Sequence, residues 1–218
     1  MADGSVGVME AAAGAWRTPA SSDPLSLSPG QVAGLVGSPG YGLTRIGLAM
    51  LAGHAQGGPV AYVDVRGWLC PSAAWEVGIP VERLVVVRCG DLVQWGRVVA
   101  TLLDGMRAIY AEVPRGAKEP ALRKLAALAR TRRTPMILRS LDAGLPSGVT
   151  HLHFEGRRVV WEGAERGHGR LRRRRSLVIA SGKAMRGMRR EIELEDHGAD
   201  ALRLVSGMGI AERRRATG

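Results

Sequence analysis

The stretch GSPGYGLTR at residues 37–45 decides how this sequence is interpreted. Gly37, Gly42 and Thr44 stand at the spacing of a phosphate-binding loop, G-x-x-x-x-G-K-[ST]. The position of the lysine is occupied by Leu43. In a working loop, backbone N–H groups surround the phosphates, the lysine neutralises their terminal charge and the hydroxyl binds magnesium. The stretch therefore predicts the turn of a nucleotide-binding loop without its principal cation.

The segments on either side supply the context that such a loop requires. The apolar stretch at residues 31–37 is expected to form a strand, and residues 44–55 a mostly buried helix. Further along, short apolar runs alternate with segments whose apolar residues recur every three or four positions. The clearest helix covers residues 91–106, with Asp91 as its N-cap. This alternation predicts an α/β domain with a largely parallel sheet flanked by helices.

The pattern changes at about residue 149, where strand-like segments follow one another between glycine-rich turns. We expect antiparallel strands that extend the sheet. Residues 1–29 are predicted to be a flexible leader, residues 30–206 the domain, and residues 207–218 a disordered basic tail. The expected C-terminal strands lie within residues 150–156, 157–163, 170–181, 189–196 and 200–206.

The formal net charge of +11 favours an anionic partner, with nucleic acid as the first candidate. The basic residues are densest in residues 166–176, where consecutive arginines on a strand would alternate between its two faces. The alternative is a solvated edge strand whose charge prevents aggregation. With almost no aromatic residues nearby for base stacking, any contact with DNA is expected to be sequence-tolerant. The predicted nucleic-acid-binding residues are Arg170, Arg172, Arg173, Arg174, Arg175, Arg189 and Arg190.

The tryptophans divide into two groups by context. Trp68, Trp75 and Trp95 lie among apolar residues and are expected to serve packing. Trp161 is the lone candidate for base stacking near the arginines, and it is likewise expected in the core. Trp16 lies in the leader, where an exposed indole would suit docking on a protein partner.

The remaining polar residues suggest no chemistry of their own. Cys70 and Cys89 are expected to be reduced thiols in or near the core. Glu191, Glu193 and Glu195 alternate on one strand and are expected to form its solvent side, paired with arginines opposite. No residue set suggests a catalytic arrangement or a metal site, and no segment suggests export or a membrane span.

The order and spacing of the elements over residues 30–206 resemble the RecA core family. The run at residues 37–91 is similar to that family's phosphate loop, first helix and second strand. The segment RAIYAEVP (107–114) resembles its Walker B strand, and TRRTPMILRS (131–140) resembles the strand that follows. The resemblance implies a RecA-like core extended by C-terminal antiparallel strands.

The same resemblance marks the residues that depart from a working ATPase. Arg66 stands at the position of the family's water-activating glutamate, and the Walker B aspartate position falls near Ala111 or Glu112. With the lysine and the general base both replaced, we expect no ATP hydrolysis, no catalytic residues and no cofactor. A weak phosphate site at the helix N-terminus stays open. The degenerate nucleotide site is predicted at Gly37, Gly42, Leu43, Thr44, Arg45, Arg66 and Glu112.

Within this family the chain looks most like the ImuA and ImuA-prime accessory proteins of bacterial damage-induced mutagenesis. That likeness implies a non-catalytic protein of the SOS response and translesion DNA synthesis. Its implied partners are an ImuB-type Y-family polymerase homologue, an error-prone DnaE-type polymerase and DNA, in the cytoplasm or at the nucleoid, with self-association left open. Two alternatives stand beside it: a SulA-like inhibitor of the division protein FtsZ, and a divergent ATPase that uses Arg45 or a partner's lysine.

Overall fold

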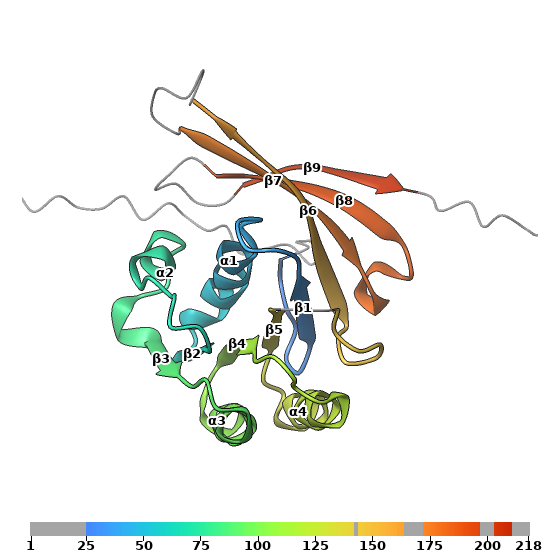
Figure 1. Cartoon of the computed structure of the whole chain (residues 1–218). Helices are drawn as coiled ribbons and strands as arrows, with labels where there is room; N and C mark the ends of the chain where they lie inside the picture. Colours follow the sequence, from blue (N-terminus) through green and yellow to red (C-terminus); the bar gives the residue numbers. More distant parts are fainter. Residues whose placement is uncertain (1–24, 142–143, 164–171, 197–202, 211–218) are drawn as a thin grey trace, which may run out of the picture.

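The structure is a computed structural model that describes residues 25–141, 144–163, 172–196 and 203–210 (Figure 1). Four helices of five residues or more alternate with five strands in the first part of this described chain, and four more strands follow. The elements are β1 (Val32–Val36), α1 (Leu43–Ala55), β2 (Val60–Asp64), α2 (Ser72–Glu76), β3 (Leu84–Arg88), α3 (Leu92–Gly105), β4 (Ala108–Val113), α4 (Glu119–Arg132), β5 (Met136–Ser140), β6 (Leu152–Glu162), β7 (Arg173–Ser181), β8 (Arg189–Asp196) and β9 (Arg203–Ile210).

All nine strands of the described residues belong to one sheet, in the order β3-β2-β4-β5-β1-β6-β7-β8-β9. From β3 to β6 each strand runs parallel to its neighbours. The last three pairings, from β6 to β9, are antiparallel. The predicted fold class is therefore confirmed: an α/β domain with a largely parallel sheet flanked by helices and extended by C-terminal antiparallel strands.

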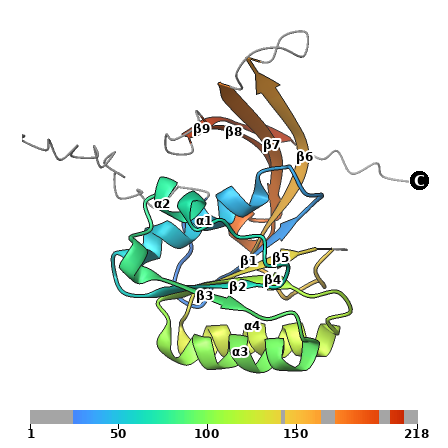
Figure 2. The ribbon, with the colours of Figure 1, turned by 60° about the vertical axis from the view of Figure 1, so that its left-hand side comes forward.

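The sheet separates two apolar cores, because alternate residues of each strand point to opposite faces. On β2, Val60 and Tyr62 join the core under α1, while Ala61 and Val63 join the core over α3 and α4. Figure 2 shows α1 and α2 on one face, α3 and α4 on the other, and β6 to β9 curving away on the side of α1. α1 therefore packs between the parallel strands and the curved strands, whose Val178 and Ile192 belong to the same core.

The clearest helix of the sequence forms as predicted. The carboxylate of Asp91 accepts a hydrogen bond of 2.7 Å from the N–H of Gln94, so Asp91 caps α3. The buried face of α3 consists of Trp95, Val99 and Leu103, one turn apart. Leu102, next to Leu103 in the chain, is only partly buried.

The leader ends earlier than expected. Leu25 and Leu27 are 8 % and 3 % exposed and pack in the core beside α1. Residues 25–29 therefore belong to the domain, because two leucines spaced two apart anchor them. At the other end β9 continues to Ile210, beyond the predicted boundary at residue 206. Residues 1–24 and 211–218 lie outside the described residues.

The two strands expected at residues 150–156 and 157–163 are one strand, β6. It pairs in parallel with β1, whereas the sequence predicted only antiparallel neighbours here. A bulge at Gly156 and Arg158 lets the strand bend away from the parallel sheet and pair with β7. Gly156 suggested a turn in the sequence, but it lies within the strand. The absence of a side chain there lets Tyr41 pack closely against the strand, since a Cβ would stand 3.0 Å from the Tyr41 side chain.

Candidate functional site

The loop between β1 and α1 has the glycine-dependent shape that the sequence predicts. Gly37 and Gly42 have φ angles of 145° and 73°, which residues with side chains rarely adopt. Gly42 is the N-cap of α1 and supplies no side-chain cap. The first residues of the helix therefore face a cleft with backbone N–H groups that the helix itself does not use. Such a terminus favours an anion.

The residue at the lysine position belongs to the core. Leu43 is 2 % exposed and packs in the cluster that α1 shares with β1 and β2. Arg45 is directed at α2, where its Nη1 lies 2.7 Å from Oε2 of Glu76. Thr44, between them, is half-buried and lines the cleft. Neither Leu43 nor Arg45 supplies a cation where the lysine of a phosphate loop would.

Arg139 on β5 fixes the loop from below, and sequence analysis missed it. Its side chain is buried, and its Nη2 donates to the carbonyl of Gly37 at 2.6 Å, while Nη1 donates to that of Leu35 at 3.3 Å. Its Nε has no partner among the described residues. Burial lowers the pKa of this guanidinium. The only sequence signal was an arginine in the otherwise apolar strand MILRS.

An ion pair joins Arg66, at the position compared with the water-activating glutamate, to Glu112, at the position compared with the Walker B aspartate. Arg66 donates to Oε1 of Glu112 through Nε at 3.0 Å and through Nη2. Oε2 of Glu112 accepts the N–H groups of Val65 and Arg66, at 3.0 and 3.1 Å, and the hydroxyl of Tyr62 lies 3.2 Å from Oε1. Glu112 is 1 % exposed. Its contacts with Val65 and Arg66 thus hold the loop after β2, and Tyr62 contacts it from β2 itself.

These contacts shift the ionisation of their neighbours. Burial lowers the pKa of Arg66, but the hydrogen bond and charge of Glu112 outweigh it and raise the pKa above its usual value. Burial raises the pKa of Tyr62, and the nearby groups of Tyr110 and Glu112 raise it further. The rings of Tyr62 and Tyr110 are stacked with centroids 4.4 Å apart. The base of the cleft is therefore a fixed layer with a neutral phenol and a paired carboxylate.

Asp64 orders the rest of this loop and was also missed. Its buried carboxylate accepts N–H groups from Gly67 at 2.8 Å, Trp68 at 3.2 Å and Leu69 at 3.1 Å. A short acidic side chain at the end of a strand, three residues before a glycine, is the pattern of a turn closed by its own side chain. The turn sets the position of Trp68 at the mouth of the cleft.

The cleft itself has a volume of about 730 Å³ and lies at the carboxyl ends of β1 and β2. Gly42, Leu43, Thr44, Arg45 and Arg66 of the predicted nucleotide site line it. Gly37 and Glu112 lie outside its lining; Glu112 is buried beneath it. Arginines of the predicted nucleic-acid site, Arg172, Arg173 and Arg174, line the same cleft. The structure therefore brings together parts of two sites that the sequence kept separate.

The predicted arginine cluster does not form one surface. Arg173 and Arg175 pair with glutamates across the strands, including Glu195 at 3.2 and 3.5 Å. The expected solvent side with paired glutamates on β8 is confirmed for Glu193 and Glu195. Arg174 turns to the other face, toward the phosphate loop, where its Cζ would lie 3.4 Å from a Cβ on Gly42.

Arg189 and Arg190 are not part of this cluster. They lie at the opposite end of the β7–β8 ladder, where Arg190 pairs with Ala180, six positions from the register of Arg174. At strand spacing that separation is about 20 Å. Arg189 contacts Glu155 at 3.6 Å, and Arg170 lies outside the described residues. Strand register therefore separates Arg189 and Arg190 from the arginines at the cleft, and the seven predicted residues stay a prediction.

Three tryptophans predicted to pack are on the surface. Trp68 is 69 % exposed and Trp161 is 51 % exposed, and Trp75 on α2 is also exposed. Trp95 is buried, as expected. Arg66 lies over the ring of Trp68 at 4.8 Å, and Arg174 lies over the ring of Trp161 at 5.4 Å. Trp16 lies outside the described residues.

The cysteines and the histidines add no second site. Cys89 is buried and Cys70 is exposed at the cleft, so the expectation of two core thiols was wrong for Cys70. A hydrogen bond from Ser72 lowers the pKa of the Cys70 thiol. Within the described residues no three His, Cys, Asp or Glu side chains are grouped to hold a metal ion. Nor does that part of the chain contain a helix of the length and hydropathy needed to cross a membrane.

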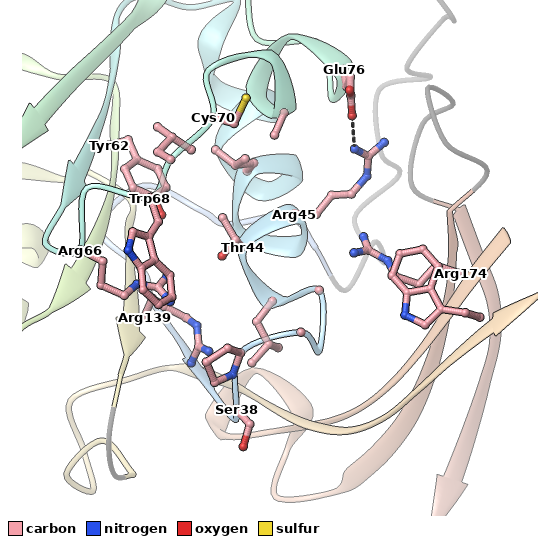
Figure 3. Close-up of a pocket in the computed structure, with 18 of the residues that line it drawn as sticks. Ser38, Thr44, Arg45, Tyr62, Arg66, Trp68, Cys70, Glu76, Arg139 and Arg174 are labelled. Atoms are coloured by element: carbon pink, nitrogen blue, oxygen red, sulfur yellow. Dashed lines mark hydrogen bonds and ion pairs between the residues drawn. The ribbon is translucent and has the colours of Figure 1, made fainter. Parts of the chain in front are cut away.

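Figure 3 shows the resulting arrangement: Trp68, Arg66 and Arg139 stand on one side, Arg174 on the other, and α1 with Thr44 and Arg45 between them. No curated protein matches the chain. A family model described as the MT3502 N-terminal domain matches residues 24–143. The matched region begins just before Leu25 and includes β1 to β5 with the glycine-rich loop between β1 and α1. Because the match covers more than half of the 218 residues, the chain belongs to the MT3502 N-terminal domain family.

Proposed function

We propose that this protein is a non-catalytic, RecA-like accessory factor of damage-induced mutagenesis, most similar to the ImuA and ImuA-prime proteins. In this role it bridges an ImuB-type Y-family polymerase homologue and an error-prone DnaE-type polymerase during translesion synthesis, and it contacts DNA. The proposal places it in the cytoplasm, at the nucleoid when DNA is damaged.

One observation carries the non-catalytic part of the proposal. Leu43, at the lysine position, is a core residue, and Arg66, at the position of the water-activating glutamate, is bonded to buried Glu112. Phosphoryl transfer depends on cations and a base that are aimed at the terminal phosphate. Here the residues at both positions stabilise the fold. This supports a domain that acts by binding partners and not by catalysis.

A surface suited to a protein partner lies along the free side of β3. Edge strands normally carry charge or short length to prevent pairing, but this one is flanked by exposed apolar side chains. They come from α2, the short 3₁₀ helix at Val81–Arg83, β3 and α3, which all lie at the β3 end of the sheet, with α2 and α3 on its opposite faces (Figures 1 and 2). Such a patch on a soluble domain favours protein contact. This β3-edge surface consists of Trp75, Val81, Val85, Val86, Leu92 and Val93.

Co-purification tests the proposal directly. Tagged full-length protein is expected to retain both polymerase partners, and omission of the protein is expected to separate them. Val93→Glu, at a side chain 67 % exposed on α3, should weaken retention of at least one partner. Val160→Glu, at an exposed valine on β6, is the matched control and should leave both in place.

Three other outcomes would contradict the proposal. Retention of neither polymerase would remove the bridging role. Filamentation of cells on overexpression, with FtsZ retained in place of a polymerase, would favour the SulA-like alternative. Turnover of ATP by the purified protein would favour a divergent ATPase.

A further inference from the structure

We propose that the cleft in front of α1 binds single-stranded nucleic acid, with Trp68 and Trp161 as stacking platforms for separate bases. This deepens the DNA contact of the proposed function and rests on that function for its biological setting. The binding itself is argued from the cleft alone.

The first step is the exposure of two indoles at one cleft. Trp68 and Trp161 both line it, and they are 69 % and 51 % exposed. They come from different elements, the turn after β2 and the end of β6. Large aromatic side chains that folding leaves exposed in a concave, basic site are the usual platforms for unpaired bases.

The second step is that both platforms are held in place. Asp64 accepts the N–H of Trp68 itself, so the backbone that carries this indole is fixed. Trp161 is directly opposite Arg174 in the β6–β7 ladder, which places the guanidinium over its ring. Each indole therefore has one face or edge covered by an arginine and the rest open to a ligand. Rings that are already positioned lose little freedom on binding.

The third step is charge. The described lining residues of the cleft include arginines from α1, the turn after β2, β5 and the start of β7. They include a single carboxylate, Glu76, which Arg45 already contacts. Arg139 is buried there, and its described hydrogen bonds go only to backbone carbonyls. Arg172 is exposed at the opposite wall. An excess of cations beside aromatic rings fits a chain that alternates phosphates with bases.

The arrangement favours a single strand over a duplex or a free nucleotide. Bases in a duplex stack on each other and present only their edges, so they cannot cover two indoles. A mononucleotide has one base for two platforms. It would also depend on the lysine position, which Leu43 fills with a core side chain. A strand of a few nucleotides uses both platforms at once, without a terminal phosphate.

The experiment is a fluorescence anisotropy titration of the full-length protein into a fluorescein-labelled deoxythymidine oligomer of about 16 nucleotides. We expect saturable binding that weakens as salt is raised, with a log–log slope of about −0.7 per phosphate contact. Trp68→Ala and Trp161→Ala are each expected to weaken binding about tenfold. Both side chains are exposed, so circular dichroism and thermal unfolding should match the wild type.

Matched controls are available on the same molecule. Trp75→Ala removes an equally exposed tryptophan that does not line the cleft and should leave affinity unchanged. Arg172→Ala should lower the magnitude of the salt slope by about 0.7, whereas Arg190→Ala, exposed but outside the cleft, should not change it.

Several results would overturn the inference. Absence of oligomer binding would do so, as would equal affinity of the wild type and both cleft variants. Full competition by ATP would indicate a mononucleotide site, and full competition by polyglutamate would indicate an acidic protein segment. If the oligomer does not bind but the polymerases still co-purify, the accessory role stands without this inference. If the oligomer binds but the polymerases do not co-purify, only the proposed function is contradicted.

Discussion

Arg66 and Glu112 form an ion pair beneath the cleft, in which the Glu112 carboxylate is buried and the Arg66 side chain is partly exposed. Arg66 donates through Nε at 3.0 Å, and both oxygens of the 1 % exposed carboxylate accept further hydrogen bonds from the chain. A carboxylate with this many donors has a structural role. The pair stabilises the turn that carries Trp68.

The effects of removing the two partners of this pair on the free energy of unfolding should not be additive. Arg66→Met leaves the buried carboxylate without its cation and should lower the free energy of unfolding by about 3 kcal/mol. The double variant Arg66→Met with Glu112→Gln should lose less than the sum of the single changes, as measured by urea unfolding. Strict additivity of the two single effects would show that the ion pair is not coupled.

Introducing a lysine at position 43 should lower the stability of the protein without producing ATP hydrolysis. Leu43→Lys places an ammonium group at a site that is 2 % exposed, so we expect a loss of about 2 kcal/mol in the free energy of unfolding. The variant should not hydrolyse ATP, because Arg66 still occupies the position of the base. Leu43→Met, of similar volume, is the control and should lose less than about 1.5 kcal/mol. A stable Leu43→Lys protein that turns over ATP would refute this prediction.

Two glycines of α1 should respond in opposite directions to alanine. A Cβ on Gly47 would stand 2.1 Å from Cε2 of Tyr110 and 2.9 Å from a methyl group of Leu35. Tyr110 is fully buried and stacked on Tyr62, so it has no room to yield. Gly47→Ala should therefore destabilise the protein by about 1–3 kcal/mol.

Gly53 is the control within the same helix. It is exposed, and nothing lies within 4 Å of its added Cβ. Gly53→Ala should raise stability by about 0.5–1 kcal/mol, since alanine loses less backbone entropy in a helix. Thermal unfolding of the two variants separates the effects. Equal behaviour of both variants would mean that α1 does not pack on β4 at the described distance.

Stability should fall as the pH drops below about 6.5. Burial lowers the pKa of His153 and of His54, and Arg107 lowers the latter further. In this range the unfolded chain binds more protons than the folded one, so the free energy of unfolding rises with pH. Urea unfolding between about pH 5.5 and about pH 7.5 should show this slope, because carboxylates do not titrate there.

The double variant His54→Gln with His153→Gln should reduce that pH dependence and leave the contribution of His151, whose pKa burial also lowers. A wild-type slope that survives in the double variant would assign the effect to other groups, and a slope of opposite sign would contradict the burial of both imidazoles.

The sequence predicted the elements well and the site only in part, for physical reasons. Helix and strand periods are local, so β1 to β5 and the cap at Asp91 followed directly. The cleft forms between elements that are distant in sequence. Strand order and register, which local periodicity does not reveal, bring these elements together. Trp68 and Trp161 are some ninety positions apart, and an apolar neighbourhood in sequence suggested burial for both.

Arg139 and Asp64 were missed for a related reason. Each is a charged residue near the end of a mainly apolar strand. Its side chain bonds the backbone of a loop, which for Arg139 is distant in sequence. The signal that would have pointed to them is a charged residue near the end of a short apolar run that is expected to be a parallel strand. The loops of such a sheet lie together at the carboxyl ends of its strands.

The most direct test of the account is calorimetric titration of the purified protein with ATP and magnesium. The account predicts no saturable heat at millimolar ATP, since the lysine position is core and the base position is an ion pair. Saturable binding at micromolar affinity, about −8 kcal/mol, would show that the loop still holds a nucleotide and would contradict the non-catalytic assignment.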